Sequence, residues 1–401
     1  MQRTSSGHAE PDLTEGPGAP LIGFGPRVRK SPYFTATERF GARAYSIYNR
    51  MYIPLYYQDP VSEYWALVED VVLWDVACER QLEITGPDAA RFAQLLTPRN
   101  LGKCAVGQCK YVLLTAEDGG ILNDPVLLRL GENHFWLSAA DADILLWARG
   151  VAAFAGMQVE VTEPDVSPVQ VQGPKSAAVM AALFGDWIYD LRYFWFRETE
   201  LDGMPIVVSR TGWSNELGYE IFLRDGRFGM QLWDRIMTAG EPHRLKLGAP
   251  SAIRRIEAAI LSYGADIDAT VNPFELGLGK FVDLDMTSDF IGKATLARIK
   301  AEGIKRSLVG VQIDGSALSG GNHEPWPIEV DWQRVGMVTS CIHSPRLDQN
   351  VGLAMVAIEH AEIGSSLGVE TPWGSRDATI VPLPFVQPPA ELRMPQLPPA
   401  V

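Results

Sequence analysis

Two turn-rich segments of this 401-residue chain carry side chains that could do chemistry in a cleft. Residues 119–125 hold Asp124 between a predicted hairpin turn and a strand, where a loop carboxylate can face a ligand. The alternative is an Asx turn that stabilises the hairpin. Residues 210–220 place Glu220 in a strand beside glycines and aromatic side chains, which suits a flat heteroaromatic ring with N–H donors. The alternative there is a surface glutamate on a glycine-rich hairpin.

Familiar catalytic and metal motifs are missing from the sequence. It has no Walker loop, no G-x-S-x-G and no H-E-x-x-H. The six histidines and four cysteines lack ligand spacing, so we expect no metal, and reduced, mostly buried thiols in a cytoplasmic protein. The formal charge of −14 without a long basic run argues against nucleic-acid binding, and no apolar segment is long enough to span a membrane.

A strand that leads through Gly-Pro into a helix occurs twice along the chain. Residues 81–85 precede a helix that runs to residue 96, and residues 169–172 precede a helix that runs to residue 184. Further strands and a helix follow each of them. This repeat of strand, helix, strand, strand, helix and strand predicts two ferredoxin-like units and an α+β fold class.

Other local patterns complete the expected elements. Asp59-Pro60 predicts a helix start, and apolar side chains at helical spacing carry the helix to about Leu73. A helix is expected over 251–261. From Ser307 onward, short strands separated by glycine and proline predict a separate all-β domain. Its expected strands are 308–313, 334–339 and 352–357.

These patterns divide the chain into four parts. We expect a flexible arm over 1–30, a core over 31–305 of two interleaved α+β domains divided near residues 80 and 165, a β domain over 306–386, and a proline-rich tail over 387–401.

Five motifs, in this order, resemble those of the glycine cleavage T-protein (aminomethyltransferase) family over about residues 31–385. They are Ile121–Asp124, residues 210–220, Asn272–Leu278, Phe290–Lys293, and Val338–Ser340 with Ser344-Pro345. Within that family the chain is most similar to dimethylsulfoniopropionate demethylases. That likeness is carried by residues 31–49, 73–81, 171–176 and 255–264.

The resemblance implies a three-domain cloverleaf around a central folate channel. Two ferredoxin-like α/β units and a C-terminal barrel or jelly-roll-like β domain would surround the channel, with tetrahydrofolate as cofactor. Glu220 would then bind the N–H groups of the pterin, Tyr111 would line the folate site, and Asp124, the catalytic candidate, would lie near the nitrogen that receives the carbon. Of the adjacent Arg254 and Arg255, which cannot share a helix face, one is expected to be solvated; Arg255 is the candidate for binding folate.

The resemblance also places four side chains beside a small-molecule methyl donor. These are Tyr48, Trp213, Phe222 and Ser262. Phe222 stands where a tyrosine is expected in the sulfoniopropionate enzymes. The missing hydroxyl would affect which methyl donor is bound, and it would not affect the binding of folate. The alternative for Trp213 is ordinary core packing.

The resemblance implies a tetrahydrofolate-dependent methyltransferase, or demethylase, that acts by direct displacement on a sulfonium such as dimethylsulfoniopropionate. One alternative is an O-demethylase of a methoxy-aromatic acid, which needs a general acid because its oxygen leaves as an anion. Another is a non-catalytic folate-binding regulator, although the Lys-Gly-Cys-Tyr-type segment of such relatives is missing. Aminomethyl transfer is disfavoured because residues 212–216 read Gly-Trp-Ser-Asn-Glu in place of Gly-Tyr-Thr-Gly-Glu. A homodimer is left open.

Overall fold

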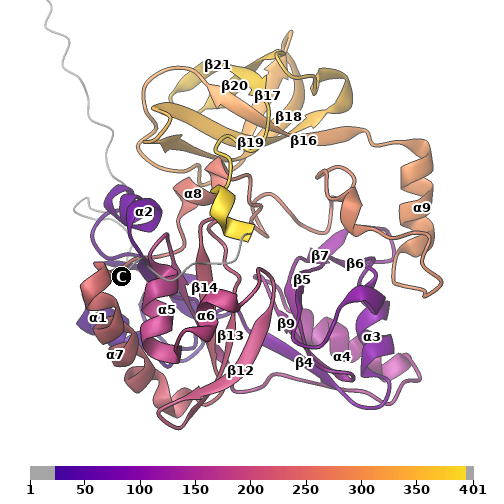
Figure 1. Ribbon diagram of the computed structural model, residues 1–401. Helices are drawn as coiled ribbons and strands as arrows, with labels where there is room; N and C mark the ends of the chain where they lie inside the picture. Colours follow the sequence, from indigo (N-terminus) through magenta and orange to yellow (C-terminus); the bar gives the residue numbers. More distant parts are fainter. Residues whose placement is uncertain (1–22, 394–401) are drawn as a thin grey trace, which may run out of the picture.

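The structure is a computed structural model that describes residues 23–393. Its main bodies are a five-stranded sheet, a six-stranded sheet and a closed barrel (Figure 1). Residues 1–22 and 394–401, which include most of the expected arm and part of the expected tail, lie outside the described residues.

The five-stranded sheet has the ferredoxin-like order that the repeat predicts, with one strand added at its edge. The order is β10-β4-β9-β8-β5, and all neighbours are antiparallel. Two helices cover one face, where Phe92 and Ala148 are fully buried. Residues 109–115 form two short strands, and the N–H of Val112 between them donates to the carbonyl of Pro125 at 2.9 Å. The elements are β4 (Gln81–Thr85), α3 (Ala89–Leu95), β5 (Cys109–Tyr111), β6 (Leu114–Thr115), β7 (Ile121–Asn123), β8 (Val126–Gly131), β9 (His134–Ser138), α4 (Ile144–Phe154) and β10 (Glu160–Thr162).

The six-stranded sheet departs from that order because one of its strands comes from earlier in the chain. The order is β12-β13-β14-β11-β3-β15, so β3 lies beside β11, where the last strand of a ferredoxin-like unit would lie. That last strand, β15, pairs in parallel with β3 instead. The chain therefore enters this sheet, leaves it to build the five-stranded sheet, and returns. The elements are β3 (Val72–Asp75), β11 (Ser167–Gln172), α5 (Ser176–Phe184), α6 (Trp187–Asp190), β12 (Phe196–Leu201), β13 (Met204–Ser209), β14 (Gly218–Leu223), α7 (Gly229–Gly240) and β15 (Lys246–Leu247).

The helix expected to run to about Leu73 is wrong at its C-terminal end. Helix α2 (Pro60–Glu69) begins as predicted, capped by the carboxylate of Asp59, but it stops at Glu69. The next residues form β3, and Val71 and Leu73 are 0% exposed. A β-branched run buried on both faces is typical of a central strand, and local helical spacing carries no information about the strands that flank it.

Two further differences lie on the N-terminal side of the core and before the barrel. The sequence patterns did not predict the hairpin of β1 (Ala44–Tyr48) and β2 (Met51–Tyr56), which follows α1 (Phe34–Arg39). Helix α8 (Ala252–Glu257) is shorter than the expected 251–261. Ala259 just beyond it has a φ of +54°, a left-handed conformation that a right-handed helix does not contain.

The C-terminal strands close into a barrel in the order β16-β19-β18-β17-β20-β21. The three strands expected from the sequence lie within β16, β18 and β19, which are longer than predicted. Val311, Ile328 and Ala354 fill its core. The elements, with the preceding helix, are α9 (Lys293–Glu302), β16 (Arg306–Ile313), β17 (Trp326–Val330), β18 (Gln333–Ser344), β19 (Gln349–Ala357), β20 (Ser366–Thr371) and β21 (Gly374–Val381).

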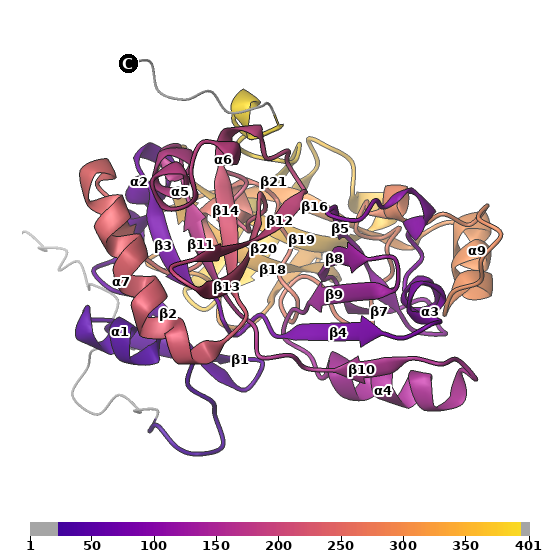
Figure 2. The ribbon, with the colours of Figure 1, turned by 60° about the horizontal axis from the view of Figure 1, so that its bottom comes forward.

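The two open sheets face each other, with their helices on the outside. Their inner faces meet in an apolar cluster of Cys109, Leu128, Leu130, Trp136, Val166, Phe196, Val207 and Phe222. Helices α5 and α7 cover the outer face of one sheet, and α3 and α4 cover that of the other (Figure 2). The barrel lies across one end, where α8 contacts β18 and β19 (Figure 1). This three-part arrangement confirms the expected α+β fold class with a C-terminal barrel.

The beginning of the proline-rich tail packs against the core. Arg210 donates hydrogen bonds of 3.2 and 2.8 Å to the carbonyls of Glu391 and Leu392, and Leu392 is buried. Within residues 23–393 no helix is long and apolar enough to span a membrane. The same residues include no group of acidic, histidine and cysteine side chains placed to hold a metal ion. The four cysteines are free and buried.

Candidate active site

Three carboxylates from distant parts of the sequence gather on the inner side of the two sheets. Glu220 lies in β14 and points to the same face as Phe222, because side chains two residues apart in a strand share a face. Asp124 directly follows β7, and Glu79 follows β3. Glu220 and Asp124 both raise the pKa of Glu79, so each of them lies within electrostatic reach of Glu79.

Asp124 is held in a half-buried position by a single aromatic hydroxyl. The hydroxyl of Tyr111 donates a 3.0 Å hydrogen bond to its Oδ2. Burial raises the pKa of Asp124 to about 7, the Tyr111 bond lowers it, and the charge of Asp266 raises it. A carboxyl with this pKa can exchange a proton near neutral pH, as general acid–base chemistry requires.

Glu220 receives donors from the strands on both sides of it. Gln170 and Ser209, its direct partners in β11 and β13, donate at 2.7 and 3.5 Å, and the hydroxyl of Thr211 also donates to it. The side chain is 4% exposed, so the alternative of a surface glutamate is wrong. Burial raises the pKa of Glu220, and these three hydrogen bonds lower it.

Glu79 is a residue that the sequence analysis did not single out as functional. The hydroxyl of Ser138 donates a weak bond of 3.4 Å to its Oε2. Burial, and then the charge of Glu220, raises the pKa of Glu79 well above its ordinary value; Ser138 lowers it and Asp124 raises it further. The sequence analysis used the segment Leu73–Gln81 only as evidence for the family resemblance. A glutamate that follows a strand has no local pattern that marks it as part of a site.

A network of buried amides holds the segments that carry Tyr48, Glu79 and Asp124. Asn49 donates bonds of 3.0, 3.0 and 3.1 Å to the carbonyls of Cys78, Ala139 and Ala140, and its Oδ1 accepts from the N–H of Ala142 at 3.1 Å. Asn49 also has a φ of +50°, which asparagine tolerates better than most residues.

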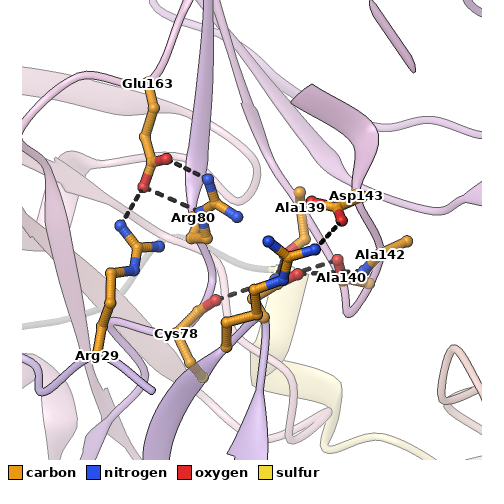
Figure 3. Close-up of polar contacts among 10 residues, drawn as sticks. Arg29, Cys78, Arg80, Ala139, Ala140, Ala142, Asp143 and Glu163 are labelled. Carbon is orange, nitrogen blue, oxygen red and sulfur yellow. Dashed lines mark hydrogen bonds and ion pairs between the residues drawn. The ribbon is translucent and has the colours of Figure 1, made fainter. Parts of the chain in front are cut away.

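A second amide joins the same network from the other side. Asn123 exchanges two hydrogen bonds, of 3.1 and 3.0 Å, with the backbone of Ala140. Figure 3 shows Cys78, Ala139, Ala140 and Ala142 around this junction. The residues directly beside Asn49, Cys78 and Asn123 in the sequence are Tyr48, Glu79 and Asp124, so the network fixes three neighbours of the site at once.

An ion-pair cluster lies beside this junction. Glu163 accepts from Arg29 at 2.8 Å and from the Nε of Arg80 at 2.9 Å, as Figure 3 shows. Arg80 immediately follows Glu79 in the sequence, but its guanidinium binds Glu163. It therefore does not neutralise the carboxylate of Glu79.

Arg255 links α8 to the barrel rather than standing free. It donates to Asp266 at 2.7 Å and to the hydroxyl of Ser340 in β18 at 2.8 Å. The N–H of Ser262 also donates to Asp266, at 3.0 Å. The guanidinium lies 5.9 Å from the ring of Trp213, which is half-buried and outside the apolar core clusters. Arg255, Ser262 and Trp213 are thus brought together on the barrel side of the core.

The expectation that one of the paired arginines is solvated is wrong. Arg254 is 0% exposed and donates to Glu216 at 2.7 Å and to the carbonyl of Asn215 at 3.3 Å. Burial of a charged side chain requires such a partner, and the sequence alone did not place Glu216 beside it.

Phe222 is not brought to the open side of this cluster. It is 0% exposed and packs in the apolar layer between the sheets, with its ring 6.3 Å from that of Trp136. The structure therefore gives this ring a packing role.

The assembled acceptors fit a part of a ligand that donates hydrogen bonds and carries no negative charge. Asp124 and Glu220 accept hydrogen bonds, and neither pairs with a lysine or arginine among residues 23–393. A carboxylate has about four lone-pair positions, so both keep accepting capacity. The N–H-rich edge of a reduced pterin fits this set of acceptors.

Comparison with known proteins agrees with these features. Residues 33–286 match the family model described as the GCVT N-terminal domain, and residues 306–387 match the glycine cleavage T-protein C-terminal barrel domain. The chain is 40% identical to a dimethylsulfoniopropionate demethylase of Ruegeria pomeroyi over 354 residues, which cover 88% of this chain and 96% of that protein.

More distant relatives share the same architecture. An aminomethyltransferase of Symbiobacterium thermophilum is 30% identical over 90% of this chain and 98% of its own length. The crystal structure of the glycine cleavage aminomethyltransferase of Bartonella henselae superposes with a TM-score of 0.82 at 23% identity, covering 90% of this chain and 99% of that one. The chain therefore belongs to the glycine cleavage T-protein family of tetrahydrofolate-dependent enzymes.

Proposed function

We propose that this enzyme transfers a methyl group from dimethylsulfoniopropionate to N5 of tetrahydrofolate. The observation that carries the proposal is the cluster of Asp124, Glu220 and Glu79, which holds carboxylates without paired cations and so suits a positively charged donor. The identity of 40% with a dimethylsulfoniopropionate demethylase over nearly its whole length supports the same donor.

When bound, the reduced pterin would supply a nucleophilic nitrogen for displacement at the methyl carbon: an N–CH₃ bond would form as the S–CH₃ bond breaks, the sulfur would leave as a neutral thioether, and the proton of the nitrogen would be released. A neutral leaving group needs no general acid. The proton needs an acceptor, and Asp124, with its pKa of about 7, is the group we assign to that role. Glu220 accepts from the pterin N–H groups, and Tyr111 holds Asp124 in place. Alignment of the reactants can contribute roughly 7–11 kcal/mol.

The carboxylate cluster disfavours a methoxy-aromatic acid as the donor. Its methyl-bearing oxygen is uncharged and would leave as an anion beside Asp124 and Glu79, which repel negative charge when they are ionised. It would also need a proton donor at the leaving oxygen. Burial, and then the charges of nearby carboxylates, raises the pKa of Tyr48, Tyr111 and Tyr263, and a phenol with a raised pKa is a poor acid.

We also propose that the enzyme works in the cytoplasm and that its partners are small molecules. The four free and buried cysteines suit a reducing compartment. A homodimer remains part of the proposal, to be tested by measuring the mass in solution.

The test is methyl transfer measured by mass spectrometry. Purified protein and tetrahydrofolate are incubated with dimethylsulfoniopropionate, a methoxybenzoate or glycine betaine, and 5-methyltetrahydrofolate is quantified. We expect product from the sulfonium. Asp124→Asn should lower kcat by roughly 10²–10⁴-fold. Glu220→Gln should weaken folate binding on the order of tenfold or more, because a charged acceptor is lost.

A matched control removes an exposed carboxylate from the loop before Asp124. Glu117 is exposed, so Glu117→Gln should leave both quantities unchanged. Product from the methoxybenzoate alone would replace the sulfonium by an aryl ether, and absence of folate binding would overturn the proposal altogether.

A further inference from the structure

Glu79 is a carboxylate that the proposed methyl transfer leaves without a task. Within residues 23–393 its side chain accepts one hydrogen bond, of 3.4 Å from the hydroxyl of Ser138, and no lysine, arginine or histidine pairs with it. The neighbouring Arg80 is turned to Glu163, and Arg255 is paired with Asp266 at 2.7 Å. The site therefore holds more carboxyl groups than cationic side chains, and a bound cation would favour their ionised form.

An aromatic side chain lies beside this carboxylate. Tyr48 is half-buried at the end of β1, and Glu79 is the charge that most raises the pKa of its phenol. The amide of Asn49 holds the carbonyl of Cys78 at 3.0 Å, so the residues that follow Tyr48 and precede Glu79 are locked together. A carboxylate and an aromatic ring that line the same place can together bind a weakly hydrated cation, by charge and by cation–π attraction.

We propose that Glu79, together with Tyr48, is the subsite for the positively charged centre of the methyl donor and makes the site select cationic over neutral donors. The proposal rests on the proposed methyl transfer. Three neighbouring carboxylates repel one another when ionised, and a bound cation removes that repulsion. A neutral donor of the same shape removes none of it. Glu79 is thus a specificity-determining residue, whereas Asp124 handles the proton.

The test compares two ligands that differ only in charge at one centre. Dimethylsulfoniopropionate and 4-methylpentanoate have nearly the same shape and share a carboxylate, but only the first has a positive sulfur. Their dissociation constants are measured by calorimetry on the full chain, alone and with 5-methyltetrahydrofolate, which cannot accept another methyl group. We expect the wild type to prefer the sulfonium by at least about tenfold.

Glu79→Gln should remove most of that preference by weakening binding of the sulfonium while leaving the binding of 4-methylpentanoate, whose branched carbon is uncharged, nearly unchanged. Glu160 in β10 is exposed, and its side chain makes no hydrogen bond or ion pair within residues 23–393. Glu160→Gln removes the same charge as Glu79→Gln and should keep the wild-type preference. Glu79→Asp, which keeps the carboxylate but shortens the side chain, should retain part of the preference for the sulfonium. An unchanged preference in Glu79→Gln, or a wild type without a preference, would overturn the proposal.

A second variant keeps the test decisive if Glu79→Gln does not fold. Tyr48→Leu removes the ring and leaves the carboxylate, and should lower the preference by about two- to fivefold. A preference equal to that of the wild type would overturn the subsite. Failure of the proposed function has a different signature, namely the absence of 5-methyltetrahydrofolate in the turnover assay with the wild type, whatever the ratio of the two dissociation constants.

Discussion

The hydroxyl of Tyr111 donates a 3.0 Å hydrogen bond to Oδ2 of Asp124, and this bond opposes the burial that raises the pKa of the carboxyl to about 7. The two residues lie on either side of the β6–β7 hairpin, so the turn places the donor opposite its acceptor. The tyrosine thus sets the pH at which the carboxylate becomes available.

The rate of methyl transfer should rise with pH through about 7. Below that value Asp124 is protonated and cannot accept the proton released at nitrogen. Tyr111→Phe removes a bond that lowers the pKa of Asp124, so the midpoint of the profile should move to higher pH, by about one unit. Steady-state kcat/KM between pH 5.5 and 9 checks this. A midpoint that stays in place in the variant would contradict the assignment of the profile to Asp124.

Asn49→Ala should destabilise the protein and impair the donor site together. Three carbonyls and one N–H lose their partner in the buried amide, at a cost of about 1–3 kcal/mol in the free energy of unfolding. The segments that carry Tyr48 and Glu79 then move apart, so KM for the donor should rise while folate affinity falls less. Denaturant unfolding and the two binding constants measure these effects. A large loss of stability with an unchanged KM would show that the Asn49 network stabilises the fold but does not position the donor site.

Asp75 should make the folded state less stable as the pH rises from about 4 to about 6. Burial raises the pKa of Asp75 from 3.8 to about 6, although Ser31 and the N–H of Ala77 donate to it at 2.5 and 3.1 Å. The folded state therefore binds this proton more tightly than the unfolded chain. The stabilisation is complete below about pH 4 and is lost as the pH passes 6, a change of about 3 kcal/mol.

The comparison with Asp75→Asn isolates the contribution of this carboxyl to the pH dependence of the unfolding free energy. The amide oxygen can still accept from the N–H of Ala77, and the amide NH₂ can donate to the hydroxyl oxygen of Ser31. Because the amide does not titrate, the difference in unfolding free energy between pH 4.5 and pH 7.5 should shrink by about 2–3 kcal/mol. Urea titrations at both pH values give the difference. Equal pH dependence in the two proteins would show that Asp75 is not buried as an acid.

Phe222→Tyr should cost stability without improving the use of the donor. The ring is fully buried between Trp136 and other apolar side chains, so an added hydroxyl lacks a partner unless the packing shifts. An unsatisfied buried hydroxyl costs about 1–3 kcal/mol. Thermal unfolding and KM for dimethylsulfoniopropionate are the measurements. A lower KM in a fully stable variant would place the hydroxyl at the donor and contradict the packing role.

The local sequence by itself determined the parts of the fold that depend on neighbouring residues. Gly-Pro turns after residues 85 and 172 mark the starts of two helices, because glycine permits the turn and proline suits the first helical turn. Short strands with glycine and proline between them predicted the C-terminal β domain. Asp124 and Glu220 were candidates from their turn-rich segments, but each also had a structural alternative there, and the family resemblance was what assigned them to the site.

Only the tertiary structure decided what lies beside what. β3 became a central strand because β11 and β15 flank it, although its own residues continue a helical pattern. Arg254 is buried because Glu216 meets it, and Phe222 is core because a second sheet covers it. Glu79 belongs to the site because Asn49, in the turn between β1 and β2, bonds the carbonyl of the preceding Cys78. Each of these outcomes depends on contacts between residues far apart in the chain, which local spacing does not specify.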